Sequence, residues 1–227
     1  MLAILRQVVA DRRASPGEDL TSALLAAGPG EDGTRLSETE LAGTLQSLLI
    51  AGHETIVNLI CNAVRALCRH RDQLDLVRSG RVSWEDVVEE TLRYDGPVGY
   101  FPFRYPTADL TVGATVIPRG APVLVSYTSA GRDADAHGPD ADRFDLNRPP
   151  GRHLSFGHGP HACLGAALAR MEGAIALEAL FRHFPELELA VPAEEVPPHP
   201  SFVGNGVEAL PVRLGRDAGL TQRLPNG

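Results

Sequence analysis

Residues 156–165 read FGHGPHACLG and place one cysteine, Cys163, between a glycine-rich loop and an apolar segment. The apolar residues that follow repeat at helical spacing (Leu164, Leu168, Met171, Ile175), so a helix is predicted directly after the loop. The first N–H groups of a helix and its positive end stabilise an anion such as a thiolate. The stretch therefore predicts a thiolate that acts as a nucleophile or as a metal ligand.

Two other interpretations of Cys163 have to be weighed. Free cysteine is among the most buried residue types, so an inert core cysteine at a helix start is the simplest alternative. A nucleophile with His161 as its base is a second alternative, but two residues apart across a tight turn is poor geometry for a base. The wider pattern F-G-x-G-x-H-x-C-x-G, which runs from Phe156 to Gly165, favours a ligand loop because several residue types agree at once.

The composition is that of an ordinary soluble protein, with 227 residues, 43% of them hydrophobic and 22% charged. A net charge of −8 without basic runs argues against nucleic-acid binding. The chain has only three cysteines, an odd and small number that does not suit a disulfide framework. This count predicts a reducing compartment. The amino terminus becomes charged at Arg6, too soon for a secretory signal, and no apolar run approaches the length needed to span a membrane. We therefore expect a cytoplasmic protein.

Hydrophobic periodicity predicts a mainly α fold with small β segments. Capping signatures at Ser37–Glu40 and Ser83–Asp86 begin two of the predicted helices. The predicted helices cover about 1–13, 19–27, 37–69, 83–94 and 164–184, with a loop at 28–33. Short β-rich runs lie between 104 and 126 and in the last forty residues. A polar coil at 131–151 has no periodicity, and a coil of that length is usually functional or specially braced.

Residues 51–55, AGHET, lie inside the longest predicted helix. Gly52 is a poor residue there, since glycine costs roughly 0.5–1 kcal/mol relative to alanine in a helix. A small residue at this point would let a flat ligand approach the backbone. The alternative is a surface Glu–Thr pair beside a tolerated glycine.

Glu90 and Arg93 are three residues apart and share one face of a predicted helix. Most pairs with this spacing are surface ion pairs of little energetic value. Cys61 and Cys68 lie seven apart on one helix face, and we expect them to pack in the core because no second cluster completes a metal site.

Taken together, the three motifs resemble the cytochrome P450 family, of the soluble bacterial type. The resemblance runs from Met1 to about Leu214 but matches only the carboxy-terminal portion of that fold, from the long central helix to the cysteine loop and the following helix. Residues 1–227 are therefore expected to form one incomplete P450 domain.

The resemblance implies that Cys163 is the thiolate ligand of the iron in haem b, whose electron donation favours O–O cleavage. Phe156 and Gly165 would flank the ligand in its loop, while His161 and Arg104 would bind haem propionates. Glu90 and Arg93 would join Arg143 in a buried network that braces the coil at 131–151.

Within the central helix, the resemblance makes Ala51 and Gly52 the groove over the iron. Glu54 and Thr55 would be the catalytic acid–alcohol pair that relays protons to dioxygen in a dry pocket. Residues 98–100 and 202–203 fall where the family lines its substrate pocket.

The implied activity is a monooxygenase that inserts one oxygen atom of O2 into a hydrophobic small molecule. Its electrons would come from a separate ferredoxin or flavodoxin, and neither nucleic acid nor a membrane would be a partner. The alternative is a truncated, non-catalytic P450-like protein that binds another enzyme.

Overall fold

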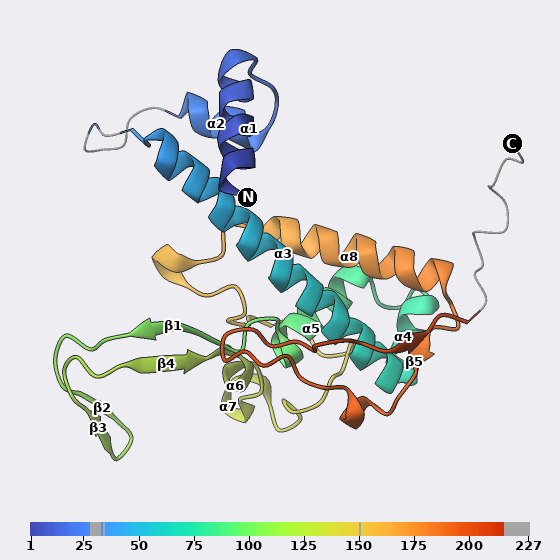
Figure 1. Cartoon of the computed structure of the whole chain (residues 1–227). Helices are drawn as coiled ribbons and strands as arrows, with labels where there is room; N and C mark the ends of the chain where they lie inside the picture. Colours follow the sequence, from blue (N-terminus) through green and yellow to red (C-terminus); the bar gives the residue numbers. More distant parts are fainter. Residues whose placement is uncertain (28–32, 34, 150, 216–227) are drawn as a thin grey trace, which may run out of the picture. The chain divides into compact units, whose positions relative to one another are not determined.

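The structure is a computed structural model that describes residues 1–27, 33, 35–149 and 151–215. It divides into two compact units, Met1–Glu54 and Thr55–Gly227. One helix, α3 (Glu38–Arg69), begins in the first unit and ends in the second (Figure 1). The predicted loop at 28–33 lies outside the described residues apart from Gly33, and the single-domain assignment stays a prediction.

The first unit is helical. It contains α1 (Leu2–Ala14), α2 (Leu20–Ala26) and the amino-terminal part of α3. Asp19 caps α2 by accepting a hydrogen bond from the Ser22 backbone N–H at 3.0 Å. The buried hydrophobic residues of this unit are aliphatic side chains on one face each of α1 and α3 (Leu5, Val9, Leu41, Ala42, Leu45). The helices predicted at 1–13 and 19–27 are confirmed.

The start of α3 is the predicted capping box. The Ser37 N–H donates to Glu40 Oε2 at 2.8 Å, and the Glu40 N–H donates to Ser37 Oγ at 3.3 Å. With 32 residues, α3 is long and apolar enough to cross a membrane by length and composition alone. The expectation that no apolar segment reaches this length is therefore wrong, although the core helix of a soluble protein passes the same test.

The second unit is built around four helices. The carboxy-terminal part of α3 packs with α4 (Arg71–Arg78), α5 (Trp84–Asp95) and α8 (Ala166–His183) (Figure 1). Fully buried aliphatic side chains come from all of these helices (Leu59, Leu67, Leu74, Val87, Leu92, Leu177). Gly173 of α8 lets the helices approach closely, because a Cβ there would lie 3.1 Å from Val88 of α5 and 3.3 Å from Leu59 of α3.

A capping box also begins α5, as the sequence predicted. Ser83 Oγ accepts from the Asp86 N–H at 3.1 Å, and Asp86 Oδ2 accepts from the Ser83 N–H at 3.0 Å. The helix ends before Gly96, where a side chain would lie 2.7 Å from the Leu92 carbonyl oxygen. This helix positions the residues that brace the cysteine loop and the coil.

The sheets are small and antiparallel. Strand β1 (Tyr100–Arg104) pairs with β4 (Val123–Ser126), β2 (Leu110–Val112) with β3 (Thr115–Ile117), and β5 (Glu188–Leu189) with β6 (Val212–Arg213). Short helical segments fill the remainder: α6 (Tyr127–Gly131), α7 (Ala134–His137), η1 (Gly159–His161) and η2 (Ala193–Glu195). The mainly α fold class with small β segments is confirmed.

Arg93 braces the polar coil after Gly131, but its partners differ from the prediction. The Glu90–Arg93 pair is buried, with Arg93 Nε 2.7 Å from Glu90 Oε2. Arg143 contributes only its backbone carbonyl, which accepts from Arg93 at 2.8 Å, and Arg143 itself is exposed. The second arginine beside Glu90 is Arg148, whose Nε lies 3.8 Å from Glu90 Oε1 and whose side chain is 12% exposed. The role predicted for the Arg143 side chain is therefore wrong.

Candidate functional site

Cys163 lies in a tight loop closed by its own backbone. The Cys163 N–H donates to the Phe156 carbonyl at 2.8 Å, and the Ala162 N–H donates to the Gly159 carbonyl at 3.0 Å. Gly157 has φ +71°, a conformation that side chains rarely adopt, and a Cβ there would lie 3.2 Å from the His161 carbonyl oxygen. The predicted helix follows as α8, with Gly165 at its N-cap. The loop thus holds an exposed cysteine directly before a long helix.

Gly165 leaves the space beside the Cys163 sulfur without a side chain. A Cβ at this position would lie 3.9 Å from Cys163 Sγ, which is an ordinary van der Waals contact. Phe156 is half-buried. Both residues that the resemblance placed beside the ligand therefore belong to the Cys163 loop.

The loop is tied to α5 and α8 by a charged cluster that sequence reasoning missed. Arg170 of α8 stacks on the ring of Phe156, with Cζ 4.6 Å from the ring centroid. Its Nε donates to Glu89 Oε1 of α5 at 2.6 Å, and Glu89 Oε2 lies 3.2 Å from His153 Nε2. Ser155 donates to the Leu92 carbonyl of α5. The sequence places Glu89 next to Glu90 on the same predicted helix. The partners of Glu89, however, are 64 and 81 residues away in the sequence.

The Glu89 cluster predicts a pH-dependent part of the stability. The hydrogen bond to His153 and then the Arg170 pair lower the pKa of Glu89 from 4.5 to about 2, against the opposing effect of burial. Since the folded pKa is the lower one, this stabilisation is complete above about pH 4.5 and is lost as the pH falls towards 2. The Glu89 side chain is 41% exposed, so solvent screening reduces this contribution to the free energy of unfolding to about 1–2 kcal/mol.

The measurement is urea unfolding of the chain and of the Glu89→Gln variant from pH 6.5 to pH 3. The difference in free energy of unfolding between them should shrink as the pH falls below 4.5. Glu178→Gln, which removes an exposed i,i+4 pair with Arg182 on α8, is the control and should show no such change. A constant difference for Glu89→Gln would contradict the assignment.

The three cysteines differ in how exposed they are. Cys61 and Cys68 are half-buried on α3, and burial raises the pKa of both thiols, with a smaller opposing effect from nearby arginines. Cys163 is exposed. Among the described residues, no group of three or more His, Cys, Asp or Glu side chains could hold a metal ion. A metal at Cys163 would therefore need most of its ligands from a cofactor.

The two residues predicted to bind haem propionates lie on the surface of the second unit. Arg104 is the last residue of β1 and His161 the last of η1, and both are exposed.

The two predicted pocket segments do meet: the Gly99 N–H donates to the Val203 carbonyl at 2.8 Å, and the rings of Phe103 and Phe202 lie 6.4 Å apart. These segments are more than 100 residues apart, and the structure brings them together.

The residues predicted for the groove and the proton relay lie on consecutive positions of α3. Ala51, Gly52 and Glu54 are exposed in the first unit, and Thr55 is the first, half-buried residue of the second. A Cβ at Gly52 would meet no described atom within 4 Å, so packing does not demand a glycine there. Helical spacing places Ala51 and Thr55 one turn apart on the same face. Their roles stay predictions.

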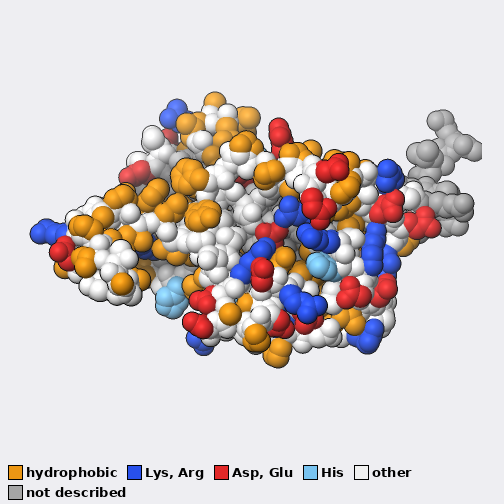
Figure 2. Space-filling model, turned by 90° about the horizontal axis from the view of Figure 1, so that it is seen from below, with side chains coloured by type: hydrophobic (Ala, Val, Ile, Leu, Met, Phe, Trp, Pro, Cys, Tyr) orange, Lys and Arg blue, Asp and Glu red, His pale blue; other side chains and the backbone are white. Residues whose placement is uncertain are grey.

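A polar hollow of about 410 Å³ lies elsewhere, between the end of α3, α4 and the braced coil. Its lining carries both signs of charge (Arg69, Asp72, Asp140, Asp142, Arg143), and Figure 2 shows acidic and basic side chains intermingled on one face of the molecule. Cys163 does not line it. An apolar substrate would make few apolar contacts in this hollow.

The comparisons with known proteins bear directly on the cysteine loop. The family profile described as cytochrome P450 matches residues 84–209, which include α5, the braced coil, the Cys163 loop and α8. The chain belongs to the cytochrome P450 family. It is 47% identical over 219 residues to the 2-hydroxy-5-methyl-1-naphthoate 7-hydroxylase of Streptomyces carzinostaticus, covering 96% of this chain and 53% of that P450. It is 43% identical to the vitamin D(3) 25-hydroxylase of Pseudonocardia autotrophica, covering 93% and 52%.

Solved P450 structures show the same fold. CYP154C4 from Streptomyces sp. ATCC 11861 has a TM-score of 0.87 at 47% identity, covering 96% of this chain and 53% of that one. CYP154A1 from Streptomyces coelicolor A3(2) has a TM-score of 0.80 at 51% identity, covering 94% and 53%. The chain thus spans about half the length of the P450 relatives it matches, and it corresponds to the carboxy-terminal portion of their fold.

P450 relatives use haem as their cofactor, and the residues around Cys163 fit that group. Haem iron takes four ligands from the porphyrin and needs one from the protein, which is what a lone exposed thiol supplies. Gly165 places no side chain beside the sulfur, where a Cβ would lie 3.9 Å from Cys163 Sγ. The donor set fits haem, whereas a structural zinc site would need four protein ligands.

Proposed function

We propose that this chain supplies the haem-thiolate centre of a bacterial P450 monooxygenase. The reaction would place one oxygen atom of O2 in a hydrophobic small molecule and reduce the other to water. The observation that carries the proposal is the exposed Cys163 at the end of a backbone-closed loop, inside the region that matches the family. Relatives described as hydroxylases support the reaction class.

The residues have distinct proposed roles. Cys163 binds the iron, and a thiolate ligand of haem pushes electron density that favours O–O cleavage. Phe156, held under Arg170, fixes the loop, while His161 and Arg104 bind propionates through their exposed polar groups. The acidic Glu54 and the hydroxyl of Thr55 would hold and pass protons, because cleavage of O–O consumes protons that a dry pocket does not otherwise supply.

The proposed partners follow from the reaction. Two electrons per turnover would come from a separate ferredoxin or flavodoxin in the cytoplasm. The substrate would contact the aromatic side chains near β1 and residue 202, where exposed rings gather (Tyr100, Phe101, Phe103, Phe202). Apolar contacts of this kind suit a hydrophobic molecule.

The test is the absorption spectrum of the haem-reconstituted protein, reduced and saturated with carbon monoxide. It is recorded for the chain alone and for the chain co-expressed with a complementary segment, defined as the residues of the Streptomyces carzinostaticus relative that precede the matched region. A strongly red-shifted Soret band is expected in at least one of the two samples.

Matched cysteine variants make this test specific. Cys163→Ser should abolish the red-shifted band, whereas Cys61→Ser, which changes a half-buried cysteine on α3, should keep it. An ordinary Soret position or no haem uptake in both samples would overturn the proposal. That second outcome is the one expected of the non-catalytic partner protein.

A further inference from the structure

His153 is a buried histidine at the start of the segment that leads into the cysteine loop, and both of its ring nitrogens have partners. Only 5% of its side chain is exposed. Nε2 lies 3.2 Å from Glu89 Oε2 of α5, and Nδ1 accepts a hydrogen bond from the Ser155 N–H at 3.3 Å. A backbone N–H can only donate, so Nδ1 carries no proton and the ring proton lies on Nε2, facing the carboxylate. His153 therefore links α5 to the backbone just before the loop.

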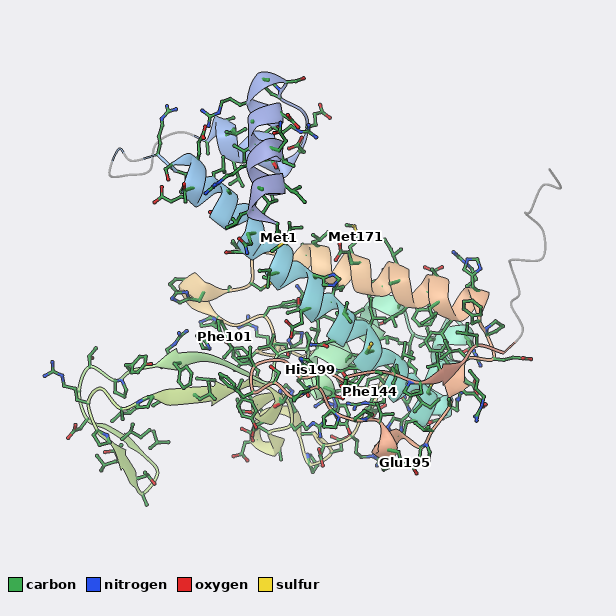
Figure 3. The ribbon with its side chains drawn as sticks, viewed as in Figure 1. Met1, Phe101, Phe144, Met171, Glu195 and His199 are labelled. Carbon is green, nitrogen blue, oxygen red and sulfur yellow. The ribbon has the colours of Figure 1, made fainter. Side chains whose placement is uncertain are left out.

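The carboxylate that His153 contacts is held from a second side. Figure 3 shows Met171 on the side of α8 turned away from the other helices of the second unit, whereas Arg170, the preceding residue, donates from Nε to Glu89 Oε1 at 2.6 Å. Glu89 is thus fixed between α5 and α8. The ring of His153 cannot rotate without losing the hydrogen bonds of both its nitrogens.

The position of Cys163 depends on this anchored backbone. Every residue from 158 to 165 is exposed, so burial in the core does not hold the loop. The loop is instead attached through the Cys163 N–H, which donates to the Phe156 carbonyl at 2.8 Å. Phe156 directly follows Ser155, whose N–H is bound by His153. A displacement of Ser155 would therefore move the acceptor of the Cys163 N–H.

We propose that His153 is a positioning residue for the Cys163 thiolate, acting through its Nδ1 acceptor on Ser155 and Phe156. Groups that hydrogen-bond to the surroundings of a metal ligand orient that ligand, and their loss weakens metal binding. The inference rests on the proposed function for the role of Cys163 as a ligand. The contacts of His153 involve the protein alone, however, so the inference also makes a prediction for the chain without haem.

The first measurement is hydrogen exchange at single amides of the full chain without haem, followed by NMR. His153→Phe keeps a ring but removes both hydrogen bonds, so the Cys163 amide should lose its protection by about tenfold or more. His153→Asn should keep the protection, because its side-chain oxygen can take the place of Nδ1. His153→Gln, whose amide reaches towards Glu89 instead, should lose the protection as His153→Phe does.

Two controls separate a local effect from a general loss of stability. The Ala190 amide donates to the Pro211 carbonyl at 2.9 Å in another part of the second unit, and its protection should not change in any variant. His183→Phe makes the same chemical change at the exposed last residue of α8 and should leave the Cys163 amide as protected as before.

The second measurement uses the haem-loaded protein, reduced and saturated with carbon monoxide. In His153→Phe the red-shifted Soret band should convert to an ordinary position about tenfold faster than in the unchanged chain, because a less well oriented thiolate is lost more readily from the iron. His153→Asn should restore the rate of the unchanged chain. This rescue is not expected if the histidine only fills space.

The inference is overturned if His153→Phe leaves the Cys163 protection or the conversion rate unchanged. Equal losses at Cys163 and Ala190 would show a general structural role, and equal losses in His153→Asn and His153→Phe would show that the Nδ1 acceptor is not the link. If His153→Phe does not fold, His153→Asn compared with His153→Gln decides the question in the same way. Expected exchange results without a red-shifted band in any preparation would remove the proposed function alone.

Discussion

Arg93→Leu is expected to destabilise the chain strongly. Arg93 is buried, and each of its five N–H donors has a partner: two go to Glu90 and one each to the carbonyls of Gly131, Ala141 and Arg143, at 2.6–2.8 Å. Leucine would remove the hydrogen bonds from Arg93 to the buried Glu90 carboxylate and to three backbone carbonyls at once. Breaking a buried pair of this kind costs about 3–5 kcal/mol, which is a large part of the ~5–15 kcal/mol that stabilises a typical protein.

Urea unfolding, followed by far-ultraviolet circular dichroism, measures the effect. Arg93→Lys should be intermediate, because lysine keeps the charge but cannot serve five acceptors in a plane. Arg182→Leu, which removes an exposed pair with Glu178, should change the free energy of unfolding by less than about 0.5 kcal/mol. An unfolding midpoint for Arg93→Leu equal to that of the unchanged chain would show that the network contributes nothing.

Gly131→Ala is expected to disrupt the junction of α5 and α6. A Cβ on Gly131 would lie 1.9 Å from the carbonyl oxygen of Arg93 and 3.0 Å from its carbon. These are backbone atoms inside a helix, so no side-chain rotation relieves the overlap. The two segments would have to separate, which also breaks the bond from Arg93 to the Gly131 carbonyl. We expect a loss of about 3 kcal/mol or more, at the upper end for overpacked sites.

Gly52→Ala is the matched control for this prediction. Gly52 lies within α3, and an added Cβ would meet no described atom within 4 Å. Alanine there should raise the free energy of unfolding by roughly 0.5–1 kcal/mol, because it favours the helix. If both alanine variants unfold at the same urea concentration, the close approach at Gly131 is not a constraint.

The helices were predictable where local chemistry marks their ends. The capping boxes at Ser37 and Ser83 set the starts of α3 and α5 within one residue. Helix α4 was missed, since eight residues directly after α3 offer too short a window for a periodic signal. The start of β1 at Tyr100 was placed late, because its pairing with β4 depends on residues more than twenty positions away.

The bracing network shows where sequence reasoning fails. The Glu90–Arg93 spacing was enough to predict a pair on one helix face, and the pair is there. The prediction that the Arg143 side chain joins this pair was wrong, because a coil without periodicity gives no rule for which side chain turns inward. His153 and Arg170, which pair with Glu89, could not be foreseen because they lie 64 and 81 residues from it in the sequence.

The arrangement around Arg93 also bears on how the second unit opens. The Asp145 N–H lies in an irregular segment, yet it donates to the buried Glu90 at 2.8 Å. That amide can exchange with solvent deuterium only when its hydrogen bond to Glu90 of α5 opens. The segment around Asp145 and the helix α5 should therefore open together, so that a loop amide is protected from exchange as an amide in a helix is.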